Sequence, residues 1–403
     1  MKQHRKKHEI LSYIYQLRTL SYLEIKEFFF DRDNLSENYC SKIVKEMLSE
    51  KTIEKVGYHK SEAYYFITKT GIKYLSEYGL IKVGRGNTEA IPLALPPYKL
   101  KIDDKNVKHQ IALNHFTLRL EELTEFDYYD EKYISLIFKN MRPDGLAVTD
   151  DICYFLEMDM NTENKRQLRE KWEHYRHFLN TTEYSEMNRP VKVLFILGGG
   201  ITDKSKRKIY LRHQIADNLS DKVSADFNFY FGTEPTLLRD VSRDNKAVIK
   251  SVLQGRGFRV GKGTLSDNSL SGYTFDFYAY EEGNGGKIIS RGGESEEFVI
   301  DDMTDGNLYS YIKLKSISGI SSMFKHKHGR DIKYLLIVNS EREAMEYIAE
   351  TGGEIVYFST IERLQKLPLH SAIFQVDKLG NIWHFSEESL RVRVDEERLK
   401  KAI

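Results

Sequence analysis

Residues 141–175 read MRPDGLAVTDDICYFLEMDMNTENKRQLREKWEHY, and this stretch decides the fold that we expect. An Arg-Pro-Asp-Gly turn precedes an apolar run at 152–156, which ends in Glu157-Met158-Asp159. A charged segment with helical spacing follows and carries Lys165 and Lys171. Acids at the end of a buried strand, with lysines on the next helix, predict a site for a magnesium ion.

The metal ligands that this pattern favours are Asp144, Glu157 and Asp159. Side chains two apart on a strand point to the same face, so Glu157 and Asp159 can reach one ion, Mg²⁺ or Mn²⁺. Lys165 or Lys171 would then lie beside the water that the metal activates for phosphodiester cleavage. In the alternative without a site, Asp144 caps a turn and the other two acids pair with basic residues of the helix.

The composition restricts the class of protein. A length of 403 residues suggests two or three domains. The 61 basic and 60 acidic residues nearly cancel, so any contact with nucleic acid must come from local patches. The 2 cysteines fit a reducing cytoplasm and exclude a disulfide framework. No run reaches the roughly 18–20 apolar residues of a membrane helix. We therefore expect a soluble, cytoplasmic protein with no membrane partner.

Residues 1–80 predict a winged helix. Apolar residues at helical spacing indicate three helices, the third capped by Ser36, and strands at 53–56 and 64–68 form a hairpin before a closing helix at 71–78. The third helix of such a module enters the major groove of double-stranded DNA. The side chains that we expect to contact DNA lie on this helix and at the hairpin tip: Ser41, Lys42, Lys45, His59 and Lys60. A winged helix used for protein contacts is the alternative.

The next regions are a proline-rich linker, residues 81–108, and a mixed helix and strand unit, residues 109–240. In this unit we expect helices at 109–123, 164–178 and 206–218, and strands at 133–138, 152–158, 191–197 and 226–231. Alternation of strands with helices predicts a mostly parallel or mixed sheet with helices on both faces.

The C-terminal part, residues 241–403, contains an apparent repeat of the central unit at 308–370. Aligned as strands, LYSYIKLK at 308–315 parallels ICYFLEMD at 152–159. Lys313 and Lys315 then replace Glu157 and Asp159, and two ammonium groups cannot hold a divalent cation. We therefore expect a degenerate, chemically inert second copy, although short units of helix and strand also resemble one another by pattern alone.

Two sets of motifs in residues 1–240 resemble the replication-relaxation family of plasmid and mobile-element proteins. The first is RPDG, an apolar strand, Glu-x-Asp and a helix with Lys and Tyr. The second is Tyr-x-Ile-Thr-x-x-Gly, with Tyr65, Ile67, Thr68 and Gly71, followed by a helix with His109-Gln110 and Asn114. The resemblance implies a DNA-binding winged helix joined to a domain similar to the PD-(D/E)xK nucleases, and a role in plasmid replication or in relaxation of DNA for transfer.

Carried over residue by residue, Asp144 matches the first acid of the nuclease motif and Glu157 matches the second. Asp159 departs from the motif because it stands where an active nuclease of this type has lysine. Lys165 or Lys171 would have to supply that charge from the helix.

The overall expectation is an α/β chain, α+β in total. A winged helix precedes a restriction-endonuclease-like domain with a mixed sheet and a degenerate second copy of it. The function that we expect is DNA binding in plasmid replication, relaxation or mobilisation, with metal-dependent nicking by Asp144, Glu157 and a lysine. The alternative is a non-catalytic replication initiator or transcriptional regulator that uses an inactive nuclease-like core for assembly. The sequence leaves open whether the chain forms a homo-oligomer.

Overall fold

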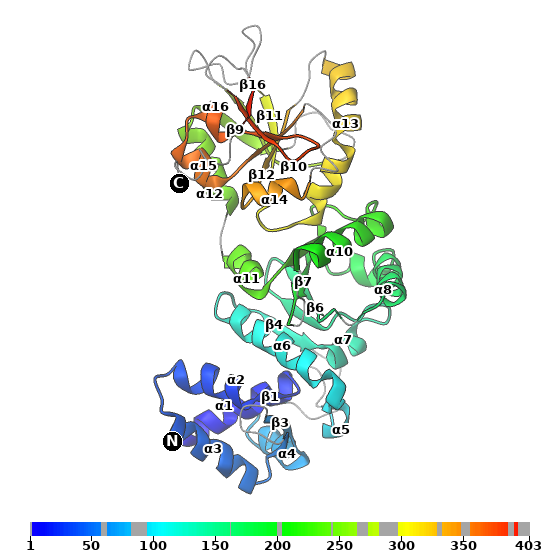
Figure 1. Cartoon of the computed structure of the whole chain (residues 1–403). Helices are drawn as coiled ribbons and strands as arrows, with labels where there is room; N and C mark the ends of the chain where they lie inside the picture. The colour runs from blue at the N-terminus through cyan, green and yellow to red at the C-terminus, as the bar shows by residue number, and fades with distance from the viewer. Residues whose placement is uncertain are drawn as a thin grey trace. The chain divides into compact units, whose positions relative to one another are not determined.

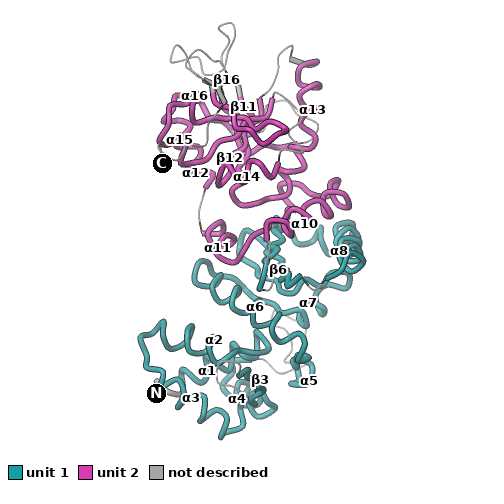
Figure 2. Tube along the Cα trace, viewed as in Figure 1, with its two compact units in different colours: residues 1–202 teal, residues 203–403 magenta. Residues whose placement is uncertain are grey.

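The computed structural model describes residues 2–57, 63–81, 95–161, 163–199, 204–242, 245–263, 273–281, 297–328, 333–347, 355–385 and 391–393. The chain forms two compact units, residues 1–202 and residues 203–403 (Figure 2). Both combine helices with a mixed sheet, so the α+β class is confirmed. No helix in the described ranges is long and apolar enough to cross a membrane. The finer domain boundaries at 80, 108 and 240 stay predictions.

The first part of unit 1, the head, combines helices with a small antiparallel sheet of strand order β1-β3-β2 (Figure 1). The strands β2 and β3 and the helices α1, α3 and α4 confirm the predicted order of elements. The elements are α1 (Lys2–Gln16), β1 (Leu20–Ser21), α2 (Tyr22–Lys26), the π-helical turn η1 (Glu27–Asp31), α3 (Glu37–Ser49), β2 (Ile53–Val56), β3 (Tyr64–Ile67) and α4 (Lys69–Glu77).

Helix α3 forms because its start is capped and one face is apolar. The Ser36 hydroxyl accepts a hydrogen bond from the Tyr39 N–H at 3.3 Å, which confirms the predicted N-cap. The buried residues recur at helical spacing: Cys40, Ile43, Val44 and Met47. Burying each large apolar side chain contributes about 1.5–3 kcal/mol. Packing of this face leaves the polar face of α3 exposed.

The Tyr65–Gly71 motif joins strand β3 to helix α4. The Thr68 hydroxyl accepts from the Gly71 N–H at 3.1 Å and so caps α4. The Thr68 N–H donates to the Thr52 carbonyl at 3.1 Å. Glycine is required at position 71 because a Cβ there would overlap the Thr52 carbonyl oxygen. The motif therefore has a structural role in the head.

The second part of unit 1 is built on strands in the order β4-β5-β6-β7. The first two pairings are antiparallel, whereas β6 and β7 are parallel. Helix α6 begins at Asp104 rather than at residue 109 as predicted. The elements are α5 (Pro97–Leu100), α6 (Asp104–Glu121), β4 (Asp127–Asp130), α7 (Glu131–Ile137), β5 (Gly145–Val148), β6 (Cys153–Asp159), α8 (Lys165–Phe178), α9 (Thr182–Ser185) and β7 (Val191–Leu197).

The predicted strand at 133–138 is wrong, because these residues lie in helix α7 (Glu131–Ile137) and at its end. Asp130 caps this helix by accepting a hydrogen bond from the Lys132 N–H at 2.9 Å. Tyr133 and Ile134 are buried, whereas Leu136 and Ile137 are 59% and 47% exposed. A short apolar run fits either a strand or a helix, and here the acidic cap decides for the helix.

Helix α8 places the lysines of the sequence motif. A capping box starts it: the Asn164 side chain accepts from the backbone N–H groups of Arg166 and Gln167, and the Gln167 side chain accepts from the Asn164 N–H. Its buried face consists of Leu168, Trp172, Tyr175 and Phe178. This face fixes the rotation of the helix about its axis and therefore decides which of its lysines reaches the sheet.

Unit 2 contains a sheet of strand order β13-β12-β11-β10-β9 and a second small sheet, β14-β15-β16. The elements are α10 (Lys204–Leu219), β8 (Phe227–Gly232), α11 (Glu234–Ser242), α12 (Asn245–Gly255), β9 (Phe258–Gly263), β10 (Phe275–Glu281), β11 (Glu297–Asp302), α13 (Leu308–His328), β12 (Lys333–Ile337), α14 (Glu341–Met345), β13 (Val356–Ser359), α15 (Ile361–Lys366), α16 (Leu369–Ala372), β14 (Gln375–Val376), β15 (Ile382–Phe385) and β16 (Arg391–Arg393).

The predicted strand at 308–315 is also wrong, because LYSYIKLK forms the start of helix α13. Residues 308–314 are all buried, so the apolar positions are not confined to one helical face and the helical period is hidden. The alignment of Lys313 and Lys315 with Glu157 and Asp159 fails for the same reason. The strand that precedes α13 is β11, which ends in Asp301-Asp302.

Candidate active site

Asp144 lies directly before strand β5, where the antiparallel partner β6 ends. Its Oδ2 atom accepts a hydrogen bond at 2.8 Å from the N–H of Met158, the residue after Glu157. The two strands therefore bring the carboxylates of Asp144 and Glu157 to the same end of the sheet. The charge of Asp144 contributes to a raised pKa of Glu157.

Glu157 is almost fully enclosed, with 2% of its surface exposed. Oε1 accepts a hydrogen bond from the Tyr175 hydroxyl at 2.6 Å, and Oε2 lies 3.0 Å from the Lys171 Nζ. Burial raises the pKa of Glu157 to about 7, while Lys171 opposes the rise and Asp144 adds to it. Glu157 is therefore a buried carboxyl group with a partner on each of its two oxygens.

Lys171 is the lysine that reaches the acids. Its Nζ also contacts Glu163 Oε1 at 2.9 Å, so it bridges two carboxylates. Burial lowers the pKa of Lys171, but Glu157, Asp144 and Glu163 outweigh that effect and raise it. The ammonium group is therefore held in its charged form next to Glu157.

His109, on helix α6, lies beside Asp144. Its Nε2 atom lies 3.0 Å from the Met158 carbonyl oxygen and 3.3 Å from Asp144 Oδ2. Burial opposes protonation, but the hydrogen bond and charge of Asp144 raise the pKa of His109. The sequence indicated this histidine only as part of a family motif, and its place beside Asp144 is a product of the fold.

Two further predicted site residues lie at the ends of neighbouring elements. Lys165 lies in the first turn of α8 and is exposed. Asp159 is buried at the end of β6, and its Oδ1 accepts from the Asn161 N–H at 2.9 Å. Its carboxylate thus caps the turn after β6. The residues that the structure brings together are Asp144, Glu157, Lys171 and His109.

A cavity of about 1070 Å³ opens onto this group within unit 1. Asp144, His109, Met158 and Lys171 lie in its wall. The other basic residues of its lining are Arg18, Lys99, Lys101, Lys105, Lys108 and Lys132. Its acidic residues are Asp144, Asp103, Glu131 and Glu163. Because basic residues outnumber acidic ones in this lining, the cavity can accommodate a polyanion beside a bound cation.

The predicted DNA contacts of the head lie partly within the described residues. Lys42 and Lys45 are exposed on α3, and with Ser41 they line a shallow groove together with Asn38, Glu46 and Ser49. The Ser41 hydroxyl is 2.8 Å from that of Tyr22. His59 and Lys60, at the predicted hairpin tip, lie outside the described residues.

Arg18 connects the head to the cavity wall. It is 5% exposed, has a positive φ of 68°, and donates to the Leu100 and Lys101 carbonyls at 3.1 and 3.3 Å. Its guanidinium group also lies 3.5 Å from Asp130. From α6, Asn114 donates to the Thr19 carbonyl at 2.6 Å. These buried contacts fix the head against the helix that carries His109.

Groups of three or more His, Cys, Asp or Glu side chains arranged to hold a metal ion do not occur among the described residues. The two motif carboxylates and the Met158 carbonyl are oxygen donors of the kind that Mg²⁺ takes with few protein ligands. The repulsion between Asp144 and Glu157 fits a cation at this position.

Comparison with curated proteins found no match. The family model described as Replication-relaxation matches residues 11–193, a range that contains most of the head, the cavity and every residue of the candidate site. The resemblance predicted from the sequence is confirmed for this range. Its description indicates a role in replication or relaxation of plasmid or mobile-element DNA. Residues 11–193 of this chain are therefore similar to the replication-relaxation family.

Proposed function

We propose that this protein is a metal-dependent DNA nickase that acts in the replication or mobilisation of a plasmid or mobile element. The observation that carries the proposal is the group formed by Asp144, Glu157 and Lys171, of which Asp144 and Lys171 lie in the wall of a cavity lined by several other lysines. Two carboxylates and one ammonium group are the side chains that hydrolysis of a phosphodiester requires.

Each residue has a role in this proposal. Asp144, Glu157 and the Met158 carbonyl would hold Mg²⁺ or Mn²⁺, which supplies a nucleophilic hydroxide and neutralises charge on the phosphate. Lys171 is charged and would stabilise negative charge that develops on the phosphate oxygens. His109 bonds to both Asp144 and the Met158 carbonyl, so it would hold two of the donors in position.

The cavity would receive the DNA backbone. Lys105 and Lys108 are exposed on helix α6, and they lie three residues apart on the same face, next to His109. Lys101 is exposed just before this helix. A row of ammonium groups that leads to the acids is suited to a phosphate chain, because each neutralised phosphate releases counterions.

The head would choose the site on double-stranded DNA as a winged helix. Helix α3 would enter the major groove with Lys42 and Lys45, which are exposed and line a groove on its polar face. Contacts of Arg18 and Asn114 join this head to α6, so binding by the head would position the cavity on the same duplex.

Nicking of supercoiled plasmid tests the proposal. With Mg²⁺ or Mn²⁺ the wild-type chain should convert supercoiled to open-circular plasmid, and Asp144→Asn or Glu157→Gln should lower the rate by at least about a hundredfold, as expected when a metal ligand is lost. Glu173→Gln is the matched control, because Glu173 is an exposed carboxylate on the same helix as Lys171. Equal nicking by the wild type and both site variants would overturn the assignment.

A second candidate, a non-catalytic DNA-binding initiator or regulator, is favoured by one specific observation. Lys171 already forms ion pairs with Glu157 and Glu163, which would make the group a structural network. This candidate predicts duplex binding that weakens steeply with salt, without metal-dependent cleavage by any form of the protein.

A further inference from the structure

The sheet of unit 2 repeats the strand plan of unit 1. In unit 1, β4, β5 and β6 pair antiparallel, and β6 then pairs parallel with β7 after helix α8. In unit 2, β9, β10 and β11 pair antiparallel, and β11 then pairs parallel with β12 after helix α13. The equivalent of β6 is therefore β11, and the equivalent of α8 is α13.

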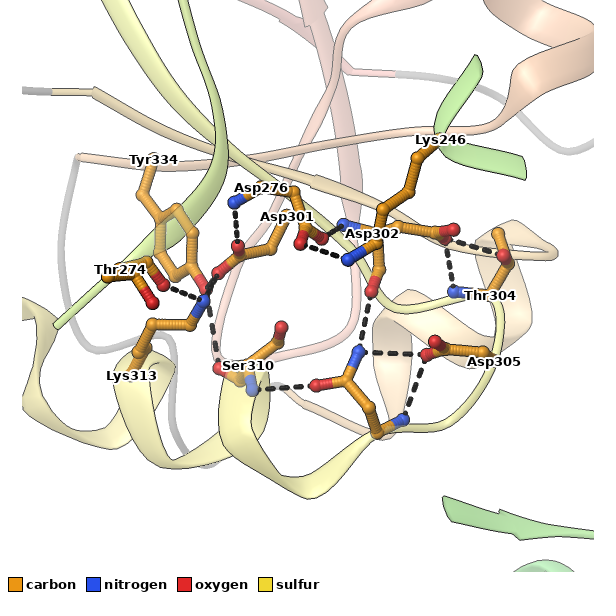
Figure 3. A network of polar contacts seen from close by, with 11 residues as sticks. Lys246, Thr274, Asp276, Asp301, Asp302, Thr304, Asp305, Ser310, Lys313 and Tyr334 are labelled. Carbon is orange, nitrogen blue, oxygen red and sulfur yellow. Dashed lines mark hydrogen bonds and ion pairs between the residues drawn. The ribbon is translucent and has the colours of Figure 1, made fainter. Parts of the chain in front are cut away.

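The carboxylates recur at the same points of this plan. Asp276 lies at the start of β10, and its Oδ2 accepts from the Asp302 N–H at 2.8 Å (Figure 3). In unit 1, Asp144 Oδ2 accepts from the Met158 N–H at the same distance, 2.8 Å. The residue before the donor is Glu157 in one unit and Asp301 in the other. Asp276 and Asp301 thus correspond to Asp144 and Glu157.

The lysine recurs as well. Lys313, on α13, places its Nζ 2.6 Å from Asp301 Oδ2, as Lys171 on α8 does with Glu157 (Figure 3). A tyrosine hydroxyl donates to the same acid in each unit, from Tyr334 to Asp301 and from Tyr175 to Glu157. Lys313 and Asp301 are 1% and 0% exposed, so this pair is more enclosed than its counterpart.

Unit 2 adds further carboxylates around this pair. Asp302 and Asp305 lie beside Asp276, which is contacted at 2.5 Å by Lys246 (Figure 3). Four carboxyl groups, Asp276, Asp301, Asp302 and Asp305, therefore lie in one cluster with two lysines, Lys246 and Lys313 (Figure 3).

An independent observation is a buried carboxyl oxygen at the edge of this cluster. The side chain of Asp240 is 6% exposed, and its Oδ2 has no hydrogen-bond partner among the described residues. Burial raises the pKa of Asp240 to about 7, and Arg239 opposes this rise while Asp305 adds to it. A buried, unpaired oxygen is costly, and a cation among these acids would remove that cost.

We propose that unit 2 carries a second acid–lysine centre, Asp276–Asp301–Lys313, that binds Mg²⁺ or Mn²⁺ and, through it, a phosphodiester. This inference extends the proposed function to a second site and does not require that unit 1 cleaves DNA. Lys313 was expected to exclude a cation because it was aligned with Glu157. In the fold it takes the place of Lys171, and the acids come from β10 and β11.

Counting bound Mn²⁺ by electron paramagnetic resonance tests the cation. The full chain should bind one ion in each unit. Asp276→Asn should remove one ion and leave the other, and Glu157→Gln should remove the other. Because Asp301→Asn alone leaves the Lys313 ammonium without its partner, the double variant Asp301→Asn/Lys313→Met removes both charges together and should also lose one ion. Glu362→Gln, an exposed acid on α15 of the same unit, should lose none.

The phosphodiester is tested in the Glu157→Gln chain, where the remaining Mn²⁺ belongs to unit 2. Dithymidine monophosphate should show enhanced phosphorus relaxation in this chain, and the enhancement should vanish when Asp276→Asn is added. Unchanged Mn²⁺ binding in properly folded Asp276→Asn, or absence of the relaxation effect, would overturn the inference. A wild-type chain that binds only one ion, which Asp276→Asn removes and Glu157→Gln leaves in place, would instead contradict the nickase proposal, so the two failures are distinguishable.

Discussion

The Nζ atom of Lys171 lies 3.0 Å from the Glu157 Oε2 atom, across the gap between helix α8 and strand β6. Glu157 is 2% exposed and the Lys171 side chain is 22% exposed, so the pair is largely shielded from water. Removing one partner leaves an uncompensated charge, and removing both does not.

Lys171→Met should therefore destabilise unit 1 by roughly 3–5 kcal/mol at neutral pH, and Glu157→Gln in the same chain should restore most of the loss. Lys165→Met, on the exposed first turn of the helix, should change stability by less than about 0.5 kcal/mol. Urea unfolding followed by Trp172 fluorescence, in a Trp383→Phe background, measures this, because Trp172 lies in α8 and is buried. A Lys171→Met chain as stable as the wild type would contradict the buried ion pair.

The stability of the head should depend on pH through Glu24. This side chain is 2% exposed in the capping box of α2, and burial raises its pKa from 4.5 to about 7. Between these values the folded chain binds more protons than the unfolded chain. The contribution of Glu24 to the free energy of unfolding is thus fully present below pH 4.5. It is lost as the pH rises through 7.

Glu24→Gln should remove this dependence, which amounts to roughly 3 kcal/mol across the window. Paired unfolding curves of wild type and variant between pH 4.5 and 7.5 give the difference. A constant difference across this range would show that Glu24 titrates alike in the folded and unfolded chains.

Gly71→Ala should destabilise the head by about 1–3 kcal/mol, because the new methyl group overlaps backbone that cannot move freely. A Cβ at this position would also lie 2.7 Å from Cγ1 of Ile67. Gly319→Ala is the matched control: it lies inside α13 with no atom within 4 Å of the new Cβ. That variant should gain about 0.5–1 kcal/mol. Thermal unfolding of both variants checks the contrast, and equal effects would contradict it.

Lys42→Ala with Lys45→Ala should weaken binding to duplex DNA and reduce its dependence on salt. If both contact phosphates, the slope of log affinity against log salt should fall by about 2. Lys69→Ala with Lys73→Ala, an exposed pair on α4, is the control and should leave the slope unchanged. Fluorescence anisotropy over a salt series measures both, and identical slopes would count against α3 as the DNA-contacting helix.

Several elements could be predicted because their local signals agree with their burial. The strand β7 (Val191–Leu197) is a continuous apolar run, and α8 has both a cap and an apolar face. By contrast, the runs at 133–138 and 308–315 are apolar without a clear period, and there capping and enclosure decide the structure. The local order of apolar and polar residues does not show how much of an element is buried by the rest of the chain.

Burial that depends on the rest of the chain also decides which of the predicted site residues come together. The sequence predicts Asp144 and Glu157 as site residues because an Arg-Pro-Asp-Gly turn precedes an apolar strand that ends in acids. The choice between Lys165 and Lys171 depends on the rotation of α8, which Trp172 and Tyr175 fix by packing. The second group of acids was missed because a helix was aligned with a strand. A signal for it was present in EFVIDD, an apolar run that ends in two acids as YFLEMD does.

Arg18 gives the head a fixed geometry with respect to the cavity beside α6. Its guanidinium group and the Asn114 amide donate hydrogen bonds to backbone carbonyls. In the proposed nickase, this arrangement would measure distance along DNA. Once α3 has docked on a base sequence, the bond that can be cut lies at one set number of base pairs from it, and cleavage would fall on a single phosphodiester instead of spreading over several.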